Sequence, residues 1–299
     1  MILCRTIAEL KNELIKIKQS SNDPTIGLVP TMGFLHEGHA SLMRQSVAEN
    51  TASVLSIFVN PMQFGPNEDF ERYPRDEERD LAIAKENGID IVFMPEVKEM
   101  YPVKPRTSVI VSQLTERLCG ASRPGHFDGV GLVVSKLFHL VQPDRAYFGM
   151  KDAQQIAVIQ QMTDDLNFPV EIIPCPIVRE PDGLALSSRN VYLTAENRQQ
   201  AVVLSQSLAL AKQWANEPGI TSEELVSRVK AKINEAGQAE IDYVEWLIYP
   251  SLEQPSWNEP IELEESKYIL ALAVKFGSTR LIDNTLFVPN VVAEVKDHV

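Results

Sequence analysis

Short apolar runs alternate with longer amphipathic segments from the N-terminus to about residue 175. The apolar runs predict buried strands at residues 26–29, 54–59, 91–93, 146–148 and 170–173. Around them, apolar residues recur at intervals of three and four and predict helices at residues 10–17, 41–49, 76–87, 130–140 and 152–166. This alternation predicts an α/β fold with a doubly wound, mostly parallel sheet that is covered by helices on both faces.

The pattern changes after Arg189. Two helices and three short strands are predicted there, at residues 195–215, 222–236, 243–248, 268–274 and 281–282. This order of elements predicts a smaller C-terminal α+β domain. We therefore expect a first domain over residues 1–177, a second domain over residues 178–288 and a flexible polar tail over residues 289–299.

Length, charge and cysteine content limit the classes of protein to consider. The 299 residues, 44% of them hydrophobic, can bury the cores of one large or two moderate domains. A net charge of −13 repels the nucleic-acid backbone, so we expect no nucleic-acid partner. No apolar run approaches the ~20 residues of a membrane span, and the three cysteines are widely spaced and odd in number. We therefore expect a cytoplasmic protein with no membrane partner.

Residues 30–39 (PTMGFLHEGH) carry the strongest chemical signal in the chain. They follow a predicted strand and precede a predicted helix, so backbone N–H groups and a helix N-terminus meet at a point where an anion can bind. His36 and His39 can donate to phosphate oxygens there while negative charge develops. The alternatives are a metal-binding pair or ordinary surface histidines, but no His-Glu-x-x-His pattern or Cys/His cluster supplies further ligands. The segment indicates nucleotide chemistry at a phosphorus atom.

Two further strand ends carry polar side chains. Asn60 and Gln63 follow the second predicted strand, where their amides can bind a small polar substrate or simply cap a turn. Lys151 lies beside the N-terminus of a later helix and is well placed for a phosphate. Gln154 and Gln155 lie on the first turn of that helix, so one of them can face the same crevice.

Two charged loops carry further signals. Ser187, Ser188 and Arg189 lie at the domain junction and suit a clamp for a polyphosphate, or form a serine-rich linker. The segment from Arg123 to His126 can add a cation and an imidazole to the same rim, or can be a tight turn.

Asp80 and His139 are interpreted from the predicted helices on which they lie. Asp80 can face a Mg²⁺–phosphate, although a charged helix start is more often solvated. His139 lies on an apolar helix, where we expect it to be packed.

Taken together, these segments resemble the pantothenate synthetase family, ligases that join pantoate to β-alanine at the expense of ATP. The resemblance is carried in family order, along nearly the whole chain, by residues 30–39, 58–64, 73–75, 120–127, 148–152, 154–155, 182–190 and 280–284. The His-x-Gly-His motif alone indicates only the nucleotidylyltransferase superfamily, whereas the full set is specific.

The resemblance implies a Rossmann-like first domain that binds ATP and pantoate, a smaller second domain that acts as a lid, and a homodimer. It implies that the pantoate carboxylate attacks the α-phosphorus of Mg·ATP to give pantoyl adenylate and pyrophosphate. The amine of β-alanine then displaces AMP. ATP is therefore expected as a substrate together with Mg²⁺, and pantoate and β-alanine as the other small-molecule partners.

The resemblance also implies roles for individual residues. His39, His36, Lys151 and Arg189 are the expected catalytic residues, with His39 in the position usually assigned as proton donor. The residues implied to bind ATP are Met32, Gly33, Phe34, Leu35, His36, Glu37, Gly38, His39, Gly149, Met150, Lys151, Asp152, Val178, Leu186, Ser187, Ser188 and Arg189.

Substrate and metal positions follow from the same resemblance. Gln63 and Gln155 are implied to hold pantoate, and Gln63 is also implied to lie near the incoming β-alanine. Asn60 and Tyr73 are further contributors, and Asp80 is the candidate metal ligand.

The chain departs from the family pattern at two positions. Met150 stands where the family commonly has glutamate, so any role of that carboxylate is absent. Arg79 precedes Asp80 where some members have adjacent acids, which weakens a two-carboxylate metal site. Two rival functions are a nucleotidylyltransferase that stops at an adenylated or cytidylylated product and a non-catalytic module that senses nucleotides or binds RNA.

Overall fold

The computed structural model describes residues 1–20, 22–66, 68–264 and 266–289. The chain forms two compact units: Met1–Pro181 with Ala185–Val191, and Asp182–Leu184 with the chain from Tyr192 onward. The flexible tail expected from residue 289 lies, apart from its first residue, outside the described residues. None of the helices in the described ranges combines the length and apolar character that a membrane span requires.

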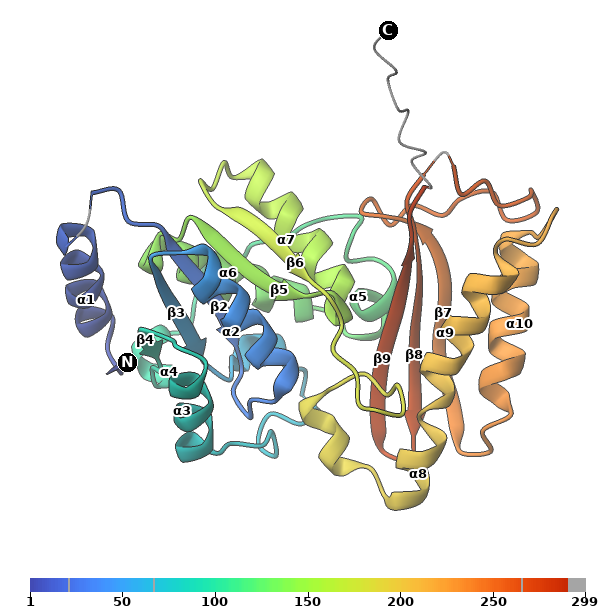
Figure 1. Cartoon of the computed structure of the whole chain (residues 1–299), viewed down its shortest axis with the longest axis horizontal. Coiled ribbons are helices and arrows are strands. Elements are labelled where there is room, and N and C mark those ends of the chain that lie inside the picture. The colour runs from blue at the N-terminus through green and yellow to red at the C-terminus, as the bar shows by residue number, and fades with distance from the viewer. Residues whose placement is uncertain (21, 67, 265, 290–299) are drawn as a thin grey trace, which may run out of the picture. The chain divides into compact units, whose positions relative to one another are not determined.

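The first unit is built on a six-stranded sheet (Figure 1). Its strands are β1 (Ile2–Cys4), β2 (Ile26–Thr31), β3 (Ala52–Ile57), β4 (Ile91–Phe93), β5 (Arg145–Gly149) and β6 (Glu171–Cys175). They lie in the order β1-β4-β3-β2-β5-β6, and every neighbouring pair is parallel. The predicted α/β fold is therefore confirmed. The sequence pattern missed β1, an edge strand of three residues of which only Cys4 is buried, whereas all three residues of β4 are buried.

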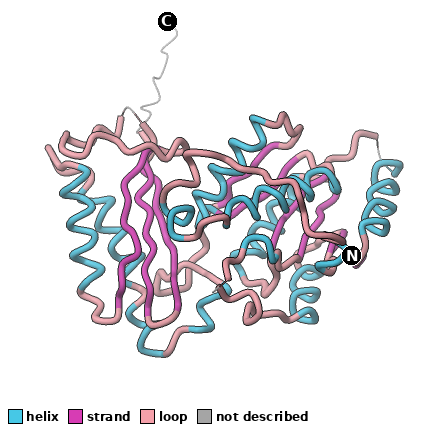
Figure 2. Tube along the Cα trace, turned by 180° about the vertical axis from the view of Figure 1, so that it is seen from behind, coloured by secondary structure: helices cyan, strands magenta, loops and turns pink. Residues whose placement is uncertain are grey.

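Helices cover the sheet in two layers, as the view from behind also shows (Figure 2). The helices of this unit are α1 (Ile7–Ser20), α2 (Glu37–Glu49), α3 (Glu77–Glu86), α4 (Val97–Met100), α5 (Leu118–Ser122), α6 (His126–Val141) and α7 (Ala153–Asp165). α2 packs on the central strands and against α3, whereas α6 packs against α1 and α7. His139, which was predicted to be packed, is exposed on α6, with its ring centroid 5.2 Å from that of Phe168.

The strand order brings two loops to one point at the edge of the sheet. From β2 the chain winds outward through β3 to β4, and then crosses back to β5 on the other side of β2. The connections that follow β2 and β5 therefore diverge from neighbouring strands, which is where open α/β sheets bind ligands. The segments after Thr31 and Gly149, both singled out from the sequence, leave the sheet at this point.

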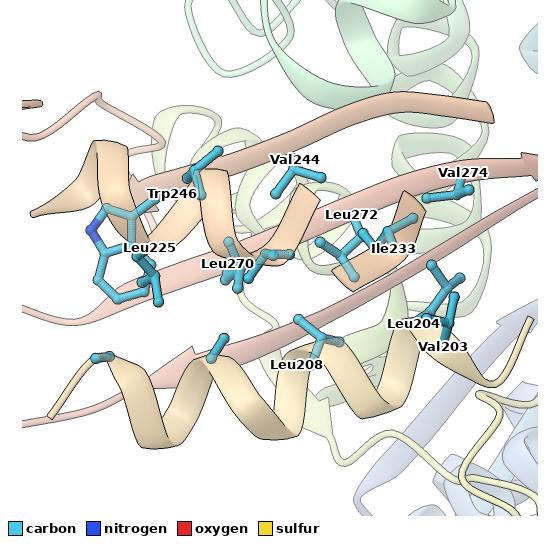
Figure 3. Packing of buried hydrophobic residues seen from close by; sticks show 14 of the residues in the cluster. Val203, Leu204, Leu208, Leu225, Ile233, Val244, Trp246, Leu270, Leu272 and Val274 are labelled. Atoms are coloured by element: carbon cyan, nitrogen blue, oxygen red, sulfur yellow. The ribbon is translucent and has the colours of Figure 1, made fainter. Parts of the chain in front are cut away.

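The second unit packs helices on an antiparallel sheet and confirms the predicted α+β architecture. Its elements are α8 (Ala195–Gln200), α9 (Val203–Trp214), α10 (Ser222–Asn234), β7 (Ala239–Ile248), β8 (Tyr268–Phe276) and β9 (Thr279–Phe287). Leu208 and Leu270 belong to its buried core (Figure 3). The single helix predicted over residues 195–215 is divided, because the N–H of Leu204 bonds to the carbonyl of Ala201, three residues back.

The serine–arginine segment belongs to the first unit. The N–H of Leu186 donates to the carbonyl of Val178 (3.0 Å), and Ser188 Oγ donates to the carbonyl of Phe34 (3.3 Å). The first unit therefore continues beyond the boundary expected after residue 177. As a result, this segment and the histidine motif lie in the same compact unit.

Candidate active site

One buried carboxylate holds the loop after β2 in shape. Gly33 has a φ of +80°, and a Cβ there would lie 2.9 Å from Asp80 Oδ2. Asp80 is buried and accepts the N–H groups of Phe34 (2.8 Å) and Leu35 (2.7 Å), one on each oxygen. Asp80 thereby fixes the path of the backbone that leads to His36.

His36 and His39 cap the start of α2 reciprocally. His36 Nδ1 accepts the N–H of Gly38 (3.2 Å), and His39 Nδ1 accepts the N–H of His36 (3.3 Å). A ring nitrogen that accepts a hydrogen bond carries no proton, so each neutral imidazole holds its proton on Nε2. The two ring centroids are 4.0 Å apart. The helix start therefore supplies two Nε2–H donors side by side.

Burial keeps both imidazoles neutral. It lowers the pKa of His36 to about 4, and the nearby Lys151 and Arg79 cations add to the effect. Burial also lowers the pKa of His39 well below its usual value, with His36 and Lys151 contributing. At neutral pH the pair donates hydrogen bonds without carrying charge.

The two histidines line a cavity of about 210 Å³ within the first unit. Many of the site residues predicted from the sequence share this wall, namely Met32, His36, Gly38, His39, Gln63, Tyr73, Gly149, Lys151, Asp152, Gln155, Val178, Leu186, Ser187, Ser188 and Arg189. They come from segments that follow β2, β3, β5 and β6. Parallel strands place their carboxyl ends at one edge, which explains why residues so far apart in sequence converge.

Some predicted site residues lie elsewhere. The predicted site residues that do not line the cavity, within the described part of the chain, are Gly33, Phe34, Leu35, Glu37, Asn60, Asp80 and Met150. Leu35 is buried in the hydrophobic core, and Glu37 pairs with Arg44 in an exposed ion pair. The Phe34 ring lies under the guanidinium of Arg79, 4.9 Å from its centroid.

Asn60 supports Gln63 and is itself enclosed. Asn60 is 1% exposed, and its Nδ2 donates to Gln63 Oε1 (3.1 Å) and to the carbonyl of Gly129 (3.0 Å). Its Oδ1 accepts the N–H of Met62 (3.2 Å) and the hydroxyl of Tyr101 (3.0 Å). These internal bonds favour turn capping over the direct substrate contact predicted for Asn60.

An apolar helix face forms the wall near Gln63. Its lining residues are Val130, Val133, Val134 and Leu137 of α6. α6 approaches the 3₁₀ turn η1 (Pro61–Gln63) closely, since a Cβ on Gly129 would lie only 2.2 Å from the carbonyl oxygen of Met62. Sequence reasoning missed this wall, because three- and four-residue apolar spacing indicates a buried face without showing what it faces.

Arg123 and His126 support Gln63 from behind. His126 Nδ1 lies 2.8 Å from the carbonyl oxygen of Gln63, and Arg123 Nη2 donates to the same oxygen at 3.3 Å. Arg123 also pairs with Glu68 through Nε, at 2.8 Å. Burial lowers the pKa of His126 to about 4, and Arg123 adds to this shift. Arg123 and His126 were predicted to lie at the rim of the site, but they hold the backbone of Gln63 and do not line the cavity.

Arg189 is held by a carboxylate that sequence reasoning missed. Its Nε and Nη2 donate to Asp69 at 3.0 and 2.9 Å. Burial on its own lowers the pKa of Arg189, but the pairing with Asp69 outweighs burial and raises it. Because Asp69 uses two of the five guanidinium N–H groups, others can reach a ligand in the cavity. Asp69 lies in a loop far from Arg189 in sequence, so no local signal marks the pair.

The geometry does not support a metal ion on Asp80. Both of its oxygens accept backbone N–H groups, and burial raises its pKa. Across the described ranges there is no group of three or more His, Cys, Asp or Glu side chains that could hold a metal ion.

Comparison with known proteins decides the family. A family model described as Pantoate-beta-alanine ligase matches residues 2–286. The chain belongs to this family. The resemblance predicted from the sequence is confirmed, and the chain is an enzyme of the ligase class.

Individual relatives match over nearly the whole chain. A pantothenate synthetase of Caldicellulosiruptor saccharolyticus is 52% identical over 284 residues, which cover 95% of this chain and 98% of the relative. The crystal structure of pantothenate synthetase from Thermus thermophilus is 43% identical, with a TM-score of 0.87, over 97% of this chain and 100% of that one. A pantoate-beta-alanine ligase from Francisella tularensis, described as complexed with Beta-gamma ATP and Beta-alanine, is 33% identical with a TM-score of 0.76, over 96% of this chain and 97% of that one.

Proposed function

We propose that the chain condenses (R)-pantoate with β-alanine to give pantothenate, through a pantoyl adenylate, and releases pyrophosphate and AMP. One observation carries the proposal: two neutral imidazole donors, a lysine and an arginine share a cavity with the amides of Gln63 and Gln155. The first set suits phosphates, and the second suits a small hydroxy acid. Membership of the family and the ligands named for the Francisella tularensis relative support it.

In the first step, a carboxylate oxygen of pantoate attacks the α-phosphorus of ATP. A phosphorus–oxygen bond to the acid forms, and the bond from the α-phosphorus to pyrophosphate breaks. His36 and His39 donate through Nε2 to the phosphate oxygens, and Lys151 and Arg189 balance the developing charge. Because anionic oxygens favour the imidazolium form, bound phosphates raise the pKa of these histidines, which allows His39 to supply a proton.

In the second step, the amine of β-alanine attacks the acyl carbonyl of the adenylate. The amide bond forms, the bond from the acyl carbon to the phosphate oxygen breaks, and AMP leaves while the amine loses a proton. We assign Gln63 and Gln155 to the pantoyl group, with Gln63 also near the amine. Tyr73 lines the same cavity as a further contributor.

Mg²⁺ is proposed to enter as part of the substrate Mg·ATP. The described cavity wall carries one carboxylate, Asp152, whose Oδ2 lies 3.8 Å from Lys151 Nζ. Such a wall suits an ion that is held mainly by phosphate oxygens and water, as Mg²⁺ commonly is.

The test is release of AMP from ATP that requires both pantoate and β-alanine. Pyrophosphate release over many turnovers with the acid alone, and no release of AMP when the amine is added, would indicate a nucleotidylyltransferase instead. Binding of ATP without turnover of any acid would indicate a nucleotide-sensing module. Either result would contradict the proposed function.

We also propose, from the family resemblance, that the chain acts in the cytoplasm as a homodimer. Light scattering should give a mass twice that of the chain. A monomeric mass under turnover conditions would contradict the dimer.

A further inference from the structure

Ser56 has a polar group for which the fold provides no partner. The residue lies on β3, is 1% exposed, and its Oγ has no hydrogen-bond partner among the described residues. Its carbonyl is satisfied, because Thr31 Oγ1 donates to it at 2.8 Å. A buried hydroxyl without a partner is destabilising, so folding alone gives no reason for serine at this position.

Ser53, on the same strand, shows the ordinary arrangement. It is also fully buried, but its Oγ lies 2.7 Å from Ser46 Oγ, and the two hydroxyls share a hydrogen bond. β3 therefore holds two buried serines, of which only Ser53 has a side-chain partner within the described part of the chain. The pair forms a matched comparison within one strand.

The alternation of β3 places the Ser56 side chain on the side of the cavity. Leu55 and Ile57 belong to the hydrophobic cluster that packs under α2. Side chains alternate between the two faces of a strand, so Ser56 and Phe58 face the opposite way. Both line the cavity, together with Gln63. The unpartnered hydroxyl thus belongs to the wall of the substrate site.

We propose that Ser56 Oγ donates a hydrogen bond to a hydroxyl oxygen of the acid substrate and thereby contributes to its selection. This assignment rests on the proposed function. The same cavity is lined by the valines of α6, and a single neutral donor in such a wall cannot compensate for burial of a carboxylate. It can satisfy a hydroxyl, and a site built for a hydroxyl rejects an analogue that lacks it.

Paired alanine variants separate this binding role from a structural one. Ser56→Ala should leave the thermal midpoint unchanged or raise it, because it removes an unsatisfied buried group, and it should raise the KM for pantoate about tenfold. The KM for ATP should stay unchanged. Ser53→Ala should do the opposite: it leaves Ser46 unpaired, lowers the thermal midpoint by about 2–4 °C and leaves both KM values unchanged.

Substrate analogues then locate the contact. Turnover is measured for pantoate and for the acids that lack its 2-hydroxyl or its 4-hydroxyl, in the wild type and in Ser56→Ala. One of the two analogues lacks the hydroxyl that Ser56 contacts, so for that analogue Ser56→Ala should turn over as fast as the wild type. If Ser56→Ala instead lowers the turnover of all three acids by the same factor, Ser56 does not contact a hydroxyl of the substrate.

The remaining outcomes are also decisive. Unfolding of Ser56→Ala, or an unchanged KM for pantoate in an active variant, would contradict the role of Ser56 alone. A wild type without pantoate-dependent turnover would contradict the proposed function, and this assignment with it.

Discussion

The two ends of the cavity are built in different ways. At the end proposed to bind phosphates (the phosphate end), His36 and His39 are held by N–H groups of their own helix start. At the end proposed to bind the acid (the acid end), Gln63 is held by Asn60 and by the packing of α6 around Gly129, which is distant in sequence. We therefore expect changes to the two imidazoles to affect turnover with little effect on folding. Changes to the packing that holds Gln63 should affect substrate binding and stability together.

His39→Asn tests the phosphate end and should give the largest effect. The Asn oxygen can replace Nδ1 as acceptor for the N–H of His36, but nothing replaces the Nε2–H donor. We expect kcat to fall by a factor of roughly 10²–10³, with little change in the thermal midpoint. His39→Gln is the matched control, because its amide can restore the donor and should retain more activity. Full activity of the Asn variant would contradict the role of His39.

Asp80→Asn tests whether the loop before His36 depends on a backbone contact or on a metal ion. The NH2 of Asn cannot accept a hydrogen bond, so the N–H of either Phe34 or Leu35 loses its partner. We expect the free energy of unfolding to fall by about 1–3 kcal/mol, while the Mg²⁺ concentration for half-maximal activity stays the same. Glu78→Gln, an exposed change on the same helix, should be nearly neutral. A higher Mg²⁺ requirement in the Asp80 variant would restore a metal role.

Gly129→Ala tests the acid end. The added methyl group would collide with the carbonyl of Met62, so α6 or η1 must move. We expect a loss of about 1–3 kcal/mol in unfolding free energy and a higher KM for pantoate, while ATP binding is retained. Gly237→Ala is the control, since a Cβ there meets nothing within 4 Å. Equal weakening of ATP and pantoate binding would show that the two ends are not separate.

Histidine titration compares the two ends without a mutation. Burial lowers the pKa of both His36 and His126 to about 4. Pyrophosphate should raise the pKa of His36, because nearby negative charge favours the imidazolium, and should leave that of His126 unchanged. NMR titration with and without pyrophosphate measures both. Equal shifts at the two rings would contradict the separation.

The same histidines predict how stability without ligand depends on pH. Their folded pKa values lie below the value of about 6.5 in an unfolded chain, so the unfolded state takes up protons first as pH falls. Their contribution to the free energy of unfolding is therefore present above about pH 6.5 and is lost as pH falls toward about 4. Replacing His126 with Asn should make the loss smaller in denaturant titrations. An unchanged pH profile would contradict the buried neutral state.

The start of α2 shows why local pattern can fail even within a correct motif. The predicted helix began at residue 41, but α2 begins at Glu37. The reciprocal histidine cap satisfies the first N–H groups and extends the helix upstream. The histidines predicted for anion binding do lie together at this helix start, but their tautomers became clear only from their backbone partners.

The sequence by itself determined the parallel sheet and pointed to the histidine and serine–arginine segments that line the cavity. Buried strands are apolar runs, and the histidine and serine–arginine motifs each lie within a few adjacent residues. Only the tertiary structure decided the acid end, the pairing of Asp69 with Arg189 and the unpartnered hydroxyl of Ser56. Periodicity records whether a side chain is buried. It cannot record which distant group meets that side chain, because strand order and helix packing decide this.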